Sequence, residues 1–256
     1  MQKRTVGQRV ILTLAAPKLK GPGQGTYQSH YVVPAEHTIV VAPQIEDRLL
    51  GALWLPYLTA WGCLVWKQNL QVGQQVLIPA ASSSVAIAAS QVVKQYGAIS
   101  VGTTRDQSKL KQLQAMPEAR FDHLITTDSE DWWRQAKKLT DGQGFDVIFD
   151  PVAAGDFLNQ EIRLLAPGGT LWIYGLLGEP DVVDVPPLIR KMASLRGWLV
   201  DELAAVGQAS SAYQHVLDRI ADGTYQLPIA GTFSLRDVQT AHSTLEQGKH
   251  IGKLIL

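Results

Sequence analysis

The feature that most constrains this chain is a short apolar strand that is followed by a turn of small residues, a helix and a second apolar strand. The first strand is expected at 76–78 and the second at 99–102. The turn at 80–84 leads into a helix with apolar residues at helical spacing, and Gly97 ends that helix. A strand, helix and strand joined in this way form a crossover, which requires the two strands to be parallel.

The same alternation continues beyond this unit. Helices are expected at 107–114, 132–139 and 157–165, and strands at 123–126, 145–149, 170–174 and 195–199. The run Pro167-Gly168-Gly169 is expected to form the turn into the strand at 170. Six parallel strands with helices between them predict an α/β fold, the doubly wound Rossmann sheet.

Both ends of the chain have a different character. Strands are expected at 10–14, 27–33, 39–41, 231–234 and 253–256, with two short helices around Pro56 between 47 and 70, a helix after Asp201 to about Ala221 and another at 235–247. We predict that residues 1–46 and 201–256 pack together as a small β-containing domain. Residues 47–200 then form the nucleotide-binding domain.

Composition excludes several classes of function. Lysine plus arginine and aspartate plus glutamate each number 23, so no net field attracts nucleic acid or an anionic membrane. The single cysteine, Cys63, excludes an intramolecular disulfide and a multi-cysteine zinc site. It also indicates a protein of the reducing cytoplasm. The six histidines show no metal-ligand spacing, so no metal site is predicted. The apolar run Val10–Ala16 is too brief for a signal sequence, and no run is long enough to span a membrane.

The turn after the first strand is the expected phosphate site. It reads Ala-Ala-Ser-Ser-Ser-Val-Ala over 80–86 and contains no glycine. Small residues still allow a pyrophosphate to approach the backbone, Ala86 allows tight packing of helix on strand, and three serine hydroxyls can donate hydrogen bonds. A serine-rich loop that only caps a structural helix remains the alternative interpretation.

The end of the second strand indicates which dinucleotide is bound. An acidic residue there would bind the ribose hydroxyls of NAD, whereas hydroxyls and a cation suit the 2′-phosphate of NADP. The chain has Thr104 and Arg105 at this place, and Lys109 follows. These cations outweigh Asp106, so NADP(H) is the predicted cofactor. The alternative is that Arg105 is a solvated surface cation.

The chain resembles the medium-chain dehydrogenase/reductase superfamily, and within it the zinc-free quinone oxidoreductase-like members. The resemblance covers nearly the whole chain and rests on short motifs that occur in the order of the family. They are residues 6–10, 31–35 and 55–61, the serine-rich turn, and residues 121–125, 165–171 and 250–254.

The resemblance implies an NADPH-dependent enzyme that transfers hydride to a quinone or an α,β-unsaturated carbonyl without zinc. It also implies that both chain ends form part of a GroES-like domain, of which this chain carries only the last third of the N-terminal portion. Relatives often dimerise through the edge strand, here Leu195–Leu199. The cofactor contacts implied by motif position are Ser82, Ser83, Ser84, Val85, Thr104, Arg105, Lys109, Thr127, Tyr174, Gly175 and Thr59.

No catalytic residue is assigned. Tyr57 and Tyr174 are the tyrosines nearest the expected cleft, and packing with the hydroxyl satisfied locally is favoured for each. A tyrosine with a lysine four positions later, as in short-chain reductases, does not occur. The alternatives are a non-catalytic NADPH-binding or interaction protein that lacks a complete substrate cleft, and a natural protein longer than this chain.

Overall fold

The structure is a computed structural model, and it describes residues 4–14 and 25–256. The end of the first apolar run, Ala15-Ala16, and the loop residues Gly21, Pro22 and Gly23 lie outside this part of the chain. Two compact units are present: Met1–Trp54 with Asp201–Leu256, and Leu55–Val200. The predicted domain boundaries and the GroES-like character of the first unit stay predictions.

The larger unit, Leu55–Val200, is built on one sheet of six parallel strands. In chain order the strands are β3 (Gln75–Ile78), β4 (Ile99–Thr104), β5 (His123–Thr126), β6 (Phe145–Asp150), β7 (Leu165–Ile173) and β8 (Ser194–Gly197). They lie in the order β5-β4-β3-β6-β7-β8, and each neighbouring pair is parallel. The prediction of a doubly wound sheet is confirmed, with the direction of winding reversing between β3 and β6.

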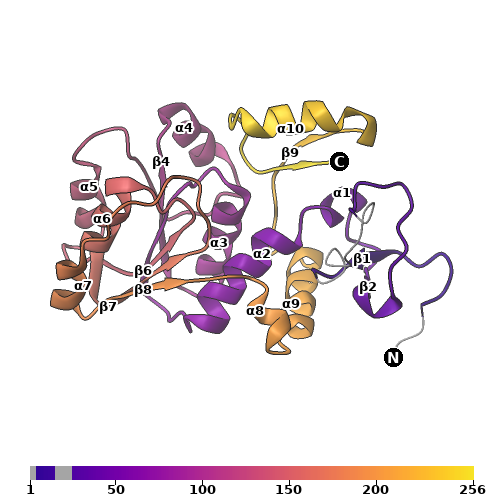
Figure 1. Cartoon of the computed structure of the whole chain (residues 1–256), viewed down its shortest axis with the longest axis horizontal. Helices are drawn as coiled ribbons and strands as arrows, with labels where there is room; N and C mark the ends of the chain where they lie inside the picture. The colour runs from indigo at the N-terminus through magenta and orange to yellow at the C-terminus, as the bar shows by residue number, and fades with distance from the viewer. Residues whose placement is uncertain (1–3, 15–24) are drawn as a thin grey trace. The chain divides into compact units, whose positions relative to one another are not determined.

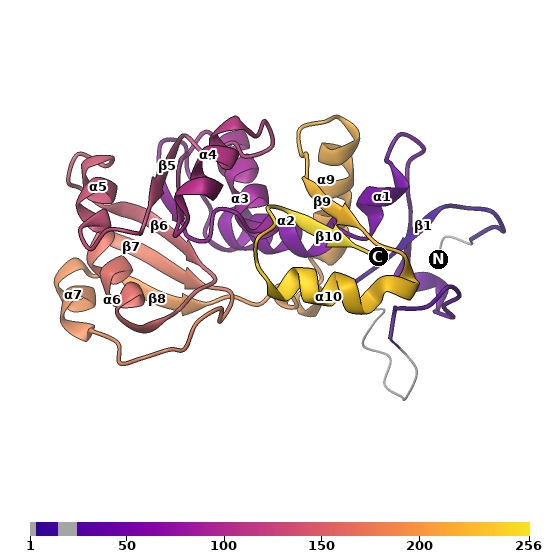
Figure 2. The ribbon, with the colours of Figure 1, turned by 90° about the horizontal axis from the view of Figure 1, so that it is seen from above.

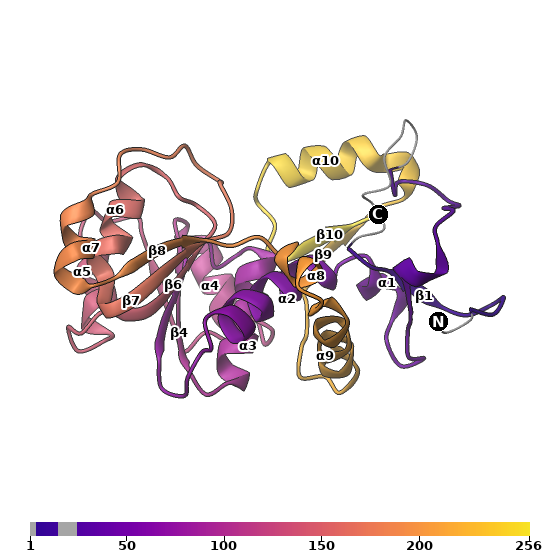
Figure 3. The same cartoon turned by 60° about the horizontal axis from the view of Figure 1, so that its bottom comes forward.

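Helices cover both faces of this sheet. The helices α3 (Ser84–Gln95) and α4 (Gln107–Ala115) lie on one face. On the other face lie α5 (Trp132–Lys138), α6 (Gly155–Leu164) and α7 (Val185–Lys191), as Figures 1, 2 and 3 show. Fully apolar strands suit such a sheet because both of its faces are buried. The core under α5 and α6 includes Trp132, Phe145, Ile148, Leu158 and Ile162.

The strand β7 begins earlier than predicted. Pro167, Gly168 and Gly169 were expected to form a turn before residue 170, but they lie within β7, where the pairing with β6 shifts register. Gly168 has a φ of 77°, which a bulge can use, and a Cβ at Gly169 would lie 2.8 Å from the Phe145 carbonyl oxygen. The glycines therefore form a bulge that starts the strand.

The helices before β3 also differ from the prediction. The first, α1, spans Asp47–Leu50, and α2 spans Trp54–Trp61 with Pro56 inside its first turn. Proline is tolerated there because the missing N–H would have no partner within the helix. The break between helices therefore precedes Pro56. A π-helix at Gly62–Lys67, which the periodicity did not predict, continues α2.

The smaller unit contains two separate strand pairs. Strand β1 (Val10–Leu12) pairs antiparallel with β2 (Thr38–Val40), and β9 (Ile229–Thr232) pairs parallel with β10 (Lys253–Ile255). A short 3₁₀ helix, Ala35–His37, precedes β2. The predicted strand at 27–33 is wrong, because these residues form bends and irregular chain.

The smaller unit also contains helices from the C-terminal part of the chain, and one of them contacts the N-terminal part. The predicted helix after Asp201 is two helices, α8 (Glu202–Ala205) and α9 (Ala209–Ala221), separated where Gly207 has a φ of 76°. The helix predicted at 235–247 is a 3₁₀ turn, Leu235–Asp237, followed by α10 (Val238–Glu246). The Tyr213 hydroxyl of α9 accepts a hydrogen bond from the Leu14 N–H at 2.9 Å. None of the helices in the described part of the chain is long and apolar enough to cross a membrane.

Candidate functional site

The carboxyl edge of the sheet brings most of the predicted cofactor residues together. Residues 82–85 follow β3, residues 104–109 end β4 and begin α4, Thr127 follows β5, and Tyr174-Gly175 follow β7. In a doubly wound sheet, ligands bind at this edge where the strand order reverses, because the loops separate there. The reversal between β3 and β6 lies beside the serine-rich turn.

The turn after β3 is held by its own backbone and by β4. The Ala81 N–H donates to the Thr103 carbonyl and the Ser83 N–H donates to the Ala80 carbonyl, both at 2.8 Å. Ala80 supplies the left-handed backbone angle, with a φ of 51°. Ala81 and Ala86 are fully buried, while the three serines are partly exposed. The turn is therefore fixed without glycine, and its hydroxyls remain near the surface.

Ser83 begins helix α3. Its Oγ accepts a hydrogen bond from the Ala86 N–H at 3.1 Å, which makes Ser83 the N-cap. The N–H groups at the start of the helix have no partner within it, and the helix dipole makes this end positive. The two interpretations of the serine turn are therefore compatible: it caps α3, and it also leaves N–H groups and hydroxyls that suit an anion.

The end of β4 carries a carboxylate that caps a helix and an arginine that is exposed. The Asp106 carboxylate accepts hydrogen bonds from the Ser108 N–H at 2.7 Å and the Lys109 N–H at 3.3 Å, so it caps α4. The Thr104 Oγ1 accepts from the Asp106 N–H at 3.3 Å. Arg105 is exposed, and its guanidinium has no hydrogen-bond or ion-pair partner in the described part of the chain. The acidic group is committed to the helix, whereas the arginine is accessible to a ligand.

Thr127 and Thr59 have different positions. The Thr127 N–H donates to the Thr104 carbonyl at 2.9 Å, which places Thr127 next to the end of β4. Thr59 is buried in α2, and its carbonyl accepts a hydrogen bond from the Trp198 indole at 3.0 Å. It lies one helical turn before the buried Cys63. No hydrogen bond joins Thr59 to the serine turn among the described residues.

The segment after β7 is packed against the end of β6. The Tyr174 ring stacks on Phe149 with centroids 4.0 Å apart, and the Tyr174 N–H donates to the Asp150 carbonyl at 2.9 Å. A Cβ at Gly175 would lie 3.0 Å from the Pro151 carbonyl oxygen, so glycine allows this close approach. Tyr174 and Gly175 are thus held against the loop after β6.

The two candidate tyrosines differ in how their hydroxyls are paired. The buried Tyr57 hydroxyl donates to Gln91 Oε1 at 3.0 Å, so the expectation of local pairing is confirmed. The Tyr174 hydroxyl is buried and makes no regular hydrogen bond to any described residue, so the same expectation is wrong there. Burial, and then the charge of Asp150, raise the pKa of Tyr174 well above its usual value, although the nearby Ser83 hydroxyl lowers it. Tyr174 therefore stays protonated.

Two buried acids at the same edge were missed by the sequence analysis. Asp150 ends β6 and Glu161 lies on α6, and both are fully buried. Burial raises the pKa of Asp150, and burial followed by the charge of Asp150 raises the pKa of Glu161 well above its usual value. The position of Asp150 at the end of an apolar strand was the available signal. The pairing with Glu161 depends on how α6 packs.

A search of the described residues finds no group of three or more His, Cys, Asp or Glu side chains that could hold a metal ion. Cys63, the one cysteine, is buried in the π-helix. No chemical step is assigned to zinc.

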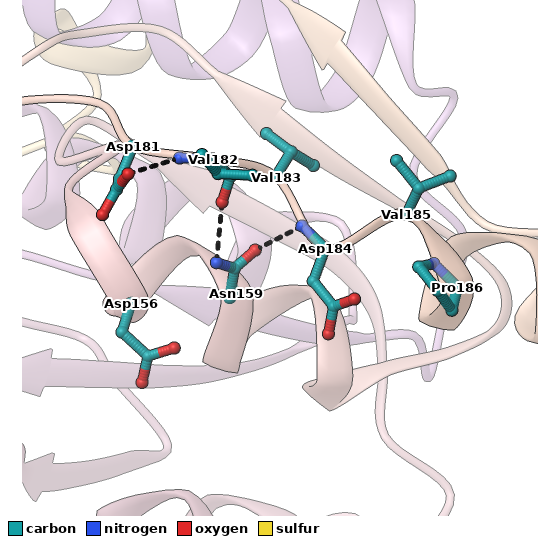
Figure 4. Close-up of a pocket in the computed structure, with 8 residues that line it drawn as sticks. All are labelled: Asp156, Asn159, Asp181, Val182, Val183, Asp184, Val185 and Pro186. Carbon is teal, nitrogen blue, oxygen red and sulfur yellow. Dashed lines mark hydrogen bonds between the residues drawn. The ribbon is translucent and has the colours of Figure 1, made fainter.

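An open pocket of about 460 Å³ lies on the larger unit, and none of the predicted cofactor residues lines it. It lies between α6 and the segment before α7, and Figure 4 shows its lining. Asn159 donates to the Val182 carbonyl at 2.9 Å and accepts from the Asp184 N–H at 2.8 Å. The lining includes the carboxylates of Asp156, Asp181 and Asp184, which would repel phosphate. This pocket is not the nucleotide site.

The chain matches the family model described as zinc-binding dehydrogenase over residues 84–222, more than half of its length. It therefore belongs to this family, within the medium-chain dehydrogenase/reductase superfamily, and is quinone oxidoreductase-like.

Three relatives show the range of proteins in which this sequence pattern occurs. The chain is 29% identical to a phenolphthiocerol/phthiocerol polyketide synthase of Mycobacterium tuberculosis, over 98% of this chain and 11% of that protein. It is 27% identical to the quinone oxidoreductase of Pongo abelii, over 89% of this chain and 68% of that protein. It is 26% identical to the 2-haloacrylate reductase of a Burkholderia species, over 98% of this chain and 74% of that protein. The chain thus spans about a tenth of the synthase and about 70% of the two reductases.

A solved structure supports the fold. The quinone oxidoreductase of Pseudomonas syringae pv. tomato DC3000 matches with a TM-score of 0.83 and 23% identity, over 99% of this chain and 76% of that one. At this identity the match shows the fold alone. Together, the family match and the relatives identify the chain as a homologue of oxidoreductases.

Proposed function

We propose that the chain is an NADPH-dependent oxidoreductase that reduces a quinone or an α,β-unsaturated carbonyl without zinc. The observation that carries this proposal is the edge formed by the serine-rich turn, Thr104 and Arg105. There an N-capped helix with partly exposed hydroxyls lies beside an accessible guanidinium. Such an edge suits a pyrophosphate and a 2′-phosphate.

Each predicted cofactor residue has a distinct task in this proposal. Ser82, Ser83, Ser84 and the N–H of Val85 would bind the pyrophosphate. Thr104, Arg105 and Lys109 would bind the 2′-phosphate, and Arg105 contributes a charged donor that an NAD ribose does not need. Thr127 would contact the cofactor after β5, the Tyr174-Gly175 pair would lie near the nicotinamide, and Thr59 would abut the cofactor, as the family resemblance implies.

When bound, NADPH would supply the hydride, and a proton must also reach the substrate. The protein would orient the dinucleotide and keep it from water, which is the usual contribution of such a domain. Tyr174 is a protonated hydroxyl at this edge, but its burial makes it a packing residue first. No catalytic acid is assigned.

The acceptor class is supported by two relatives. One is named a quinone oxidoreductase and the other a 2-haloacrylate reductase, and an acrylate is an α,β-unsaturated acid. Both kinds of acceptor are electron-poor and can accept hydride without a metal. Zinc independence and a cytoplasmic location are part of this proposal.

Steady-state oxidation of NADPH tests the proposal. The purified chain is assayed with quinones, enones and acrylates, and each assay is repeated with NADH. The proposal expects turnover with at least one acceptor class and a preference for NADPH. Saturable NADPH binding with no turnover of any acceptor would favour the alternative, a non-catalytic NADPH-binding protein. Absence of binding would contradict both.

We also propose a homodimer that forms through the edge strand of the sheet. Strand β8 is the last strand in the sheet order, so one side of its backbone has no strand partner among the described residues. Exposed edges of this kind pair readily with another strand. Exposed apolar side chains lie near it at Ile189, Met192 and Leu199.

A further inference from the structure

Asp150 and Glu161 form a buried acid pair beside the candidate nucleotide site. Both residues are fully buried, and each carboxyl group lies within hydrogen-bond reach of the other. No lysine, arginine or histidine in the described ranges forms an ion pair with either group. Two buried carboxylates that lie side by side without a cation cannot both be ionised. The pair must therefore hold a proton.

The hydrogen bonds around the pair indicate which residue holds the proton. The Asp150 carboxylate oxygens accept hydrogen bonds from the Val152 and Ala153 N–H groups, each at 2.7 Å. These bonds stabilise the charged form of Asp150. Neither oxygen of Glu161 accepts a hydrogen bond from any described N–H or O–H group. We therefore assign the proton to Glu161, whose carboxyl group lies next to that of Asp150.

The charged member of the pair fixes two loops at the carboxyl edge. Asp150 holds the start of the loop after β6, where Ala153 has a φ of 47°. The segment after β7 is bonded to this loop: the Leu177 N–H donates to the Pro151 carbonyl at 2.9 Å, and the Gly178 N–H donates to the Val152 carbonyl at 3.0 Å. Tyr174 and Gly175 lie at the start of this segment. A change at Asp150 would therefore reach the proposed cofactor site.

Few other titratable groups face the pair. Tyr174, from the segment after β7, is the group on which the charge of Asp150 acts, and burial keeps it protonated. Cys63, from the π-helix, acts on Tyr174. Ser83, from the serine-rich turn, faces the Tyr174 hydroxyl and does not titrate. The total charge of Asp150, Glu161 and Tyr174 therefore depends on whether Glu161 is protonated.

We propose that Glu161 is a positioning residue, and that the proton it shares with Asp150 holds the loops after β6 and β7 in the conformation that binds NADPH. Loss of this proton would leave two negative charges in a buried site and push α6 away from the end of β6, from which Asp150 holds the loop that the segment after β7 is bonded to. Binding of NADPH then weakens as the pH rises through the raised pKa of Glu161. The part of this inference that concerns NADPH rests on the proposed function, whereas the buried proton does not.

Titration of NADPH binding against pH tests the positioning role. In the wild-type protein the Kd rises by up to about tenfold for each pH unit above the pKa of Glu161, because one proton is linked to binding. Glu161→Gln keeps a donor to Asp150 and cannot ionise, so it binds like wild type at neutral pH and lacks this alkaline rise. Glu161→Leu removes the donor and binds more weakly at neutral pH. Glu130→Gln, at an exposed glutamate, is the matched control and keeps the wild-type profile.

Infrared spectroscopy tests the proton without any cofactor. The wild-type protein at neutral pH shows the C=O stretch of a buried protonated carboxyl, and the band disappears as the pH rises. The band is absent from Glu161→Gln and present in Glu130→Gln. A band that is absent from the wild type, or unchanged in Glu161→Gln, would overturn the proposal whether or not NADPH binds.

Thermal unfolding against pH provides a further independent measurement. The pKa of Glu161 is raised in the folded state, so its contribution to stability is complete below its ordinary pKa of 4.5 and is lost as the pH rises through the folded value. The alkaline loss of stability is therefore smaller in Glu161→Gln than in the wild type. If the infrared band is present but the two proteins share one NADPH-binding profile, the positioning role is wrong. If NADPH does not bind at all, the proposed function fails while the infrared result still stands.

Discussion

Ser83 links the start of helix α3 to the candidate phosphate site at the scale of one residue. Its Oγ accepts from the Ala86 N–H, and its hydroxyl proton remains available to a ligand or to the nearby Tyr174. One serine thus contributes both to folding and to the proposed binding. The two contributions can be separated, because stability is measured without cofactor.

Replacing the cap is expected to destabilise the protein measurably. Ser83→Ala removes the acceptor for the Ala86 N–H and should lower the free energy of unfolding by about 1 kcal/mol. For a chain of this size the melting temperature would then fall by about 2 to 4 °C. Ser84→Ala is the matched control, since Ser84 is not the cap, and should change stability by less than about 0.5 kcal/mol. Equal losses in the two variants would show that Ser83 does not cap α3.

Arg105 carries the preference for NADPH in this account. Arg105→Ala removes a charge-assisted contact to the 2′-phosphate, which is worth about 1.5 to 3 kcal/mol, so NADPH affinity should fall by about tenfold to a hundredfold. NADH has no 2′-phosphate, and its affinity should stay the same. Arg190→Ala, at an exposed position in the last turn of α7, is the control. An equal loss for both dinucleotides would contradict the assignment. The measurement is fluorescence titration.

At the scale of elements, the sequence predicts most of the sheet because its strands are short apolar runs between helices. Strand β5 (His123–Thr126) has the predicted bounds. The bounds of β3, β4 and β6 differ from the predicted ones by one or two residues. The bulge in β7 and the π-helix at Gly62–Lys67 were not predicted. Both depend on which neighbouring elements pack against them, and hydrophobic periodicity does not contain that information.

The same limit applies to the candidate site. Ser83 and Arg105 were predicted because they follow strands in a recognisable unit. The acid pair was not predicted, because Asp150 and Glu161 meet only when α6 packs on the sheet. The strand predicted at 27–33 failed for a similar reason: β-rich composition alone does not supply a partner strand.

The turn between α5 and β6 depends on one glycine more than on its neighbour. Gly144 has a φ of 91°, and a Cβ there would lie 2.5 Å from the Leu164 carbonyl oxygen. Gly142 has a φ of 81°, with nothing within 4 Å of the added atom. Gly142→Ala should therefore cost only the backbone strain, about 1 to 2 kcal/mol. Gly144→Ala adds a backbone clash and should cost roughly 3 kcal/mol or more. Chemical denaturation compares the two, and equal costs would contradict the packing described here.

At the scale of the whole molecule, the formal net charge is zero, so assembly would depend on a specific surface. Strand β8 provides that surface in the proposed dimer. Gly197 lies on β8 and is exposed, with room for a side chain. Gly197→Lys places a charge on this edge and should weaken the dimer by at least about tenfold. Gln114→Lys, on the exposed side of α4, adds the same charge elsewhere and should leave it intact. Light scattering over a range of concentrations measures both, and a wild-type monomer would rule out the dimer.

The proposed function depends on NADPH binding at the carboxyl edge of the sheet beside α3. Fluorescence titration of the wild-type chain with NADPH, and then with NADH, tests it most directly. We expect one saturable site per chain, with NADPH bound at least about tenfold more tightly than NADH because only NADPH has a 2′-phosphate for Arg105. Equal affinities would contradict the role of Arg105, and the absence of any saturable binding would contradict the proposed function itself.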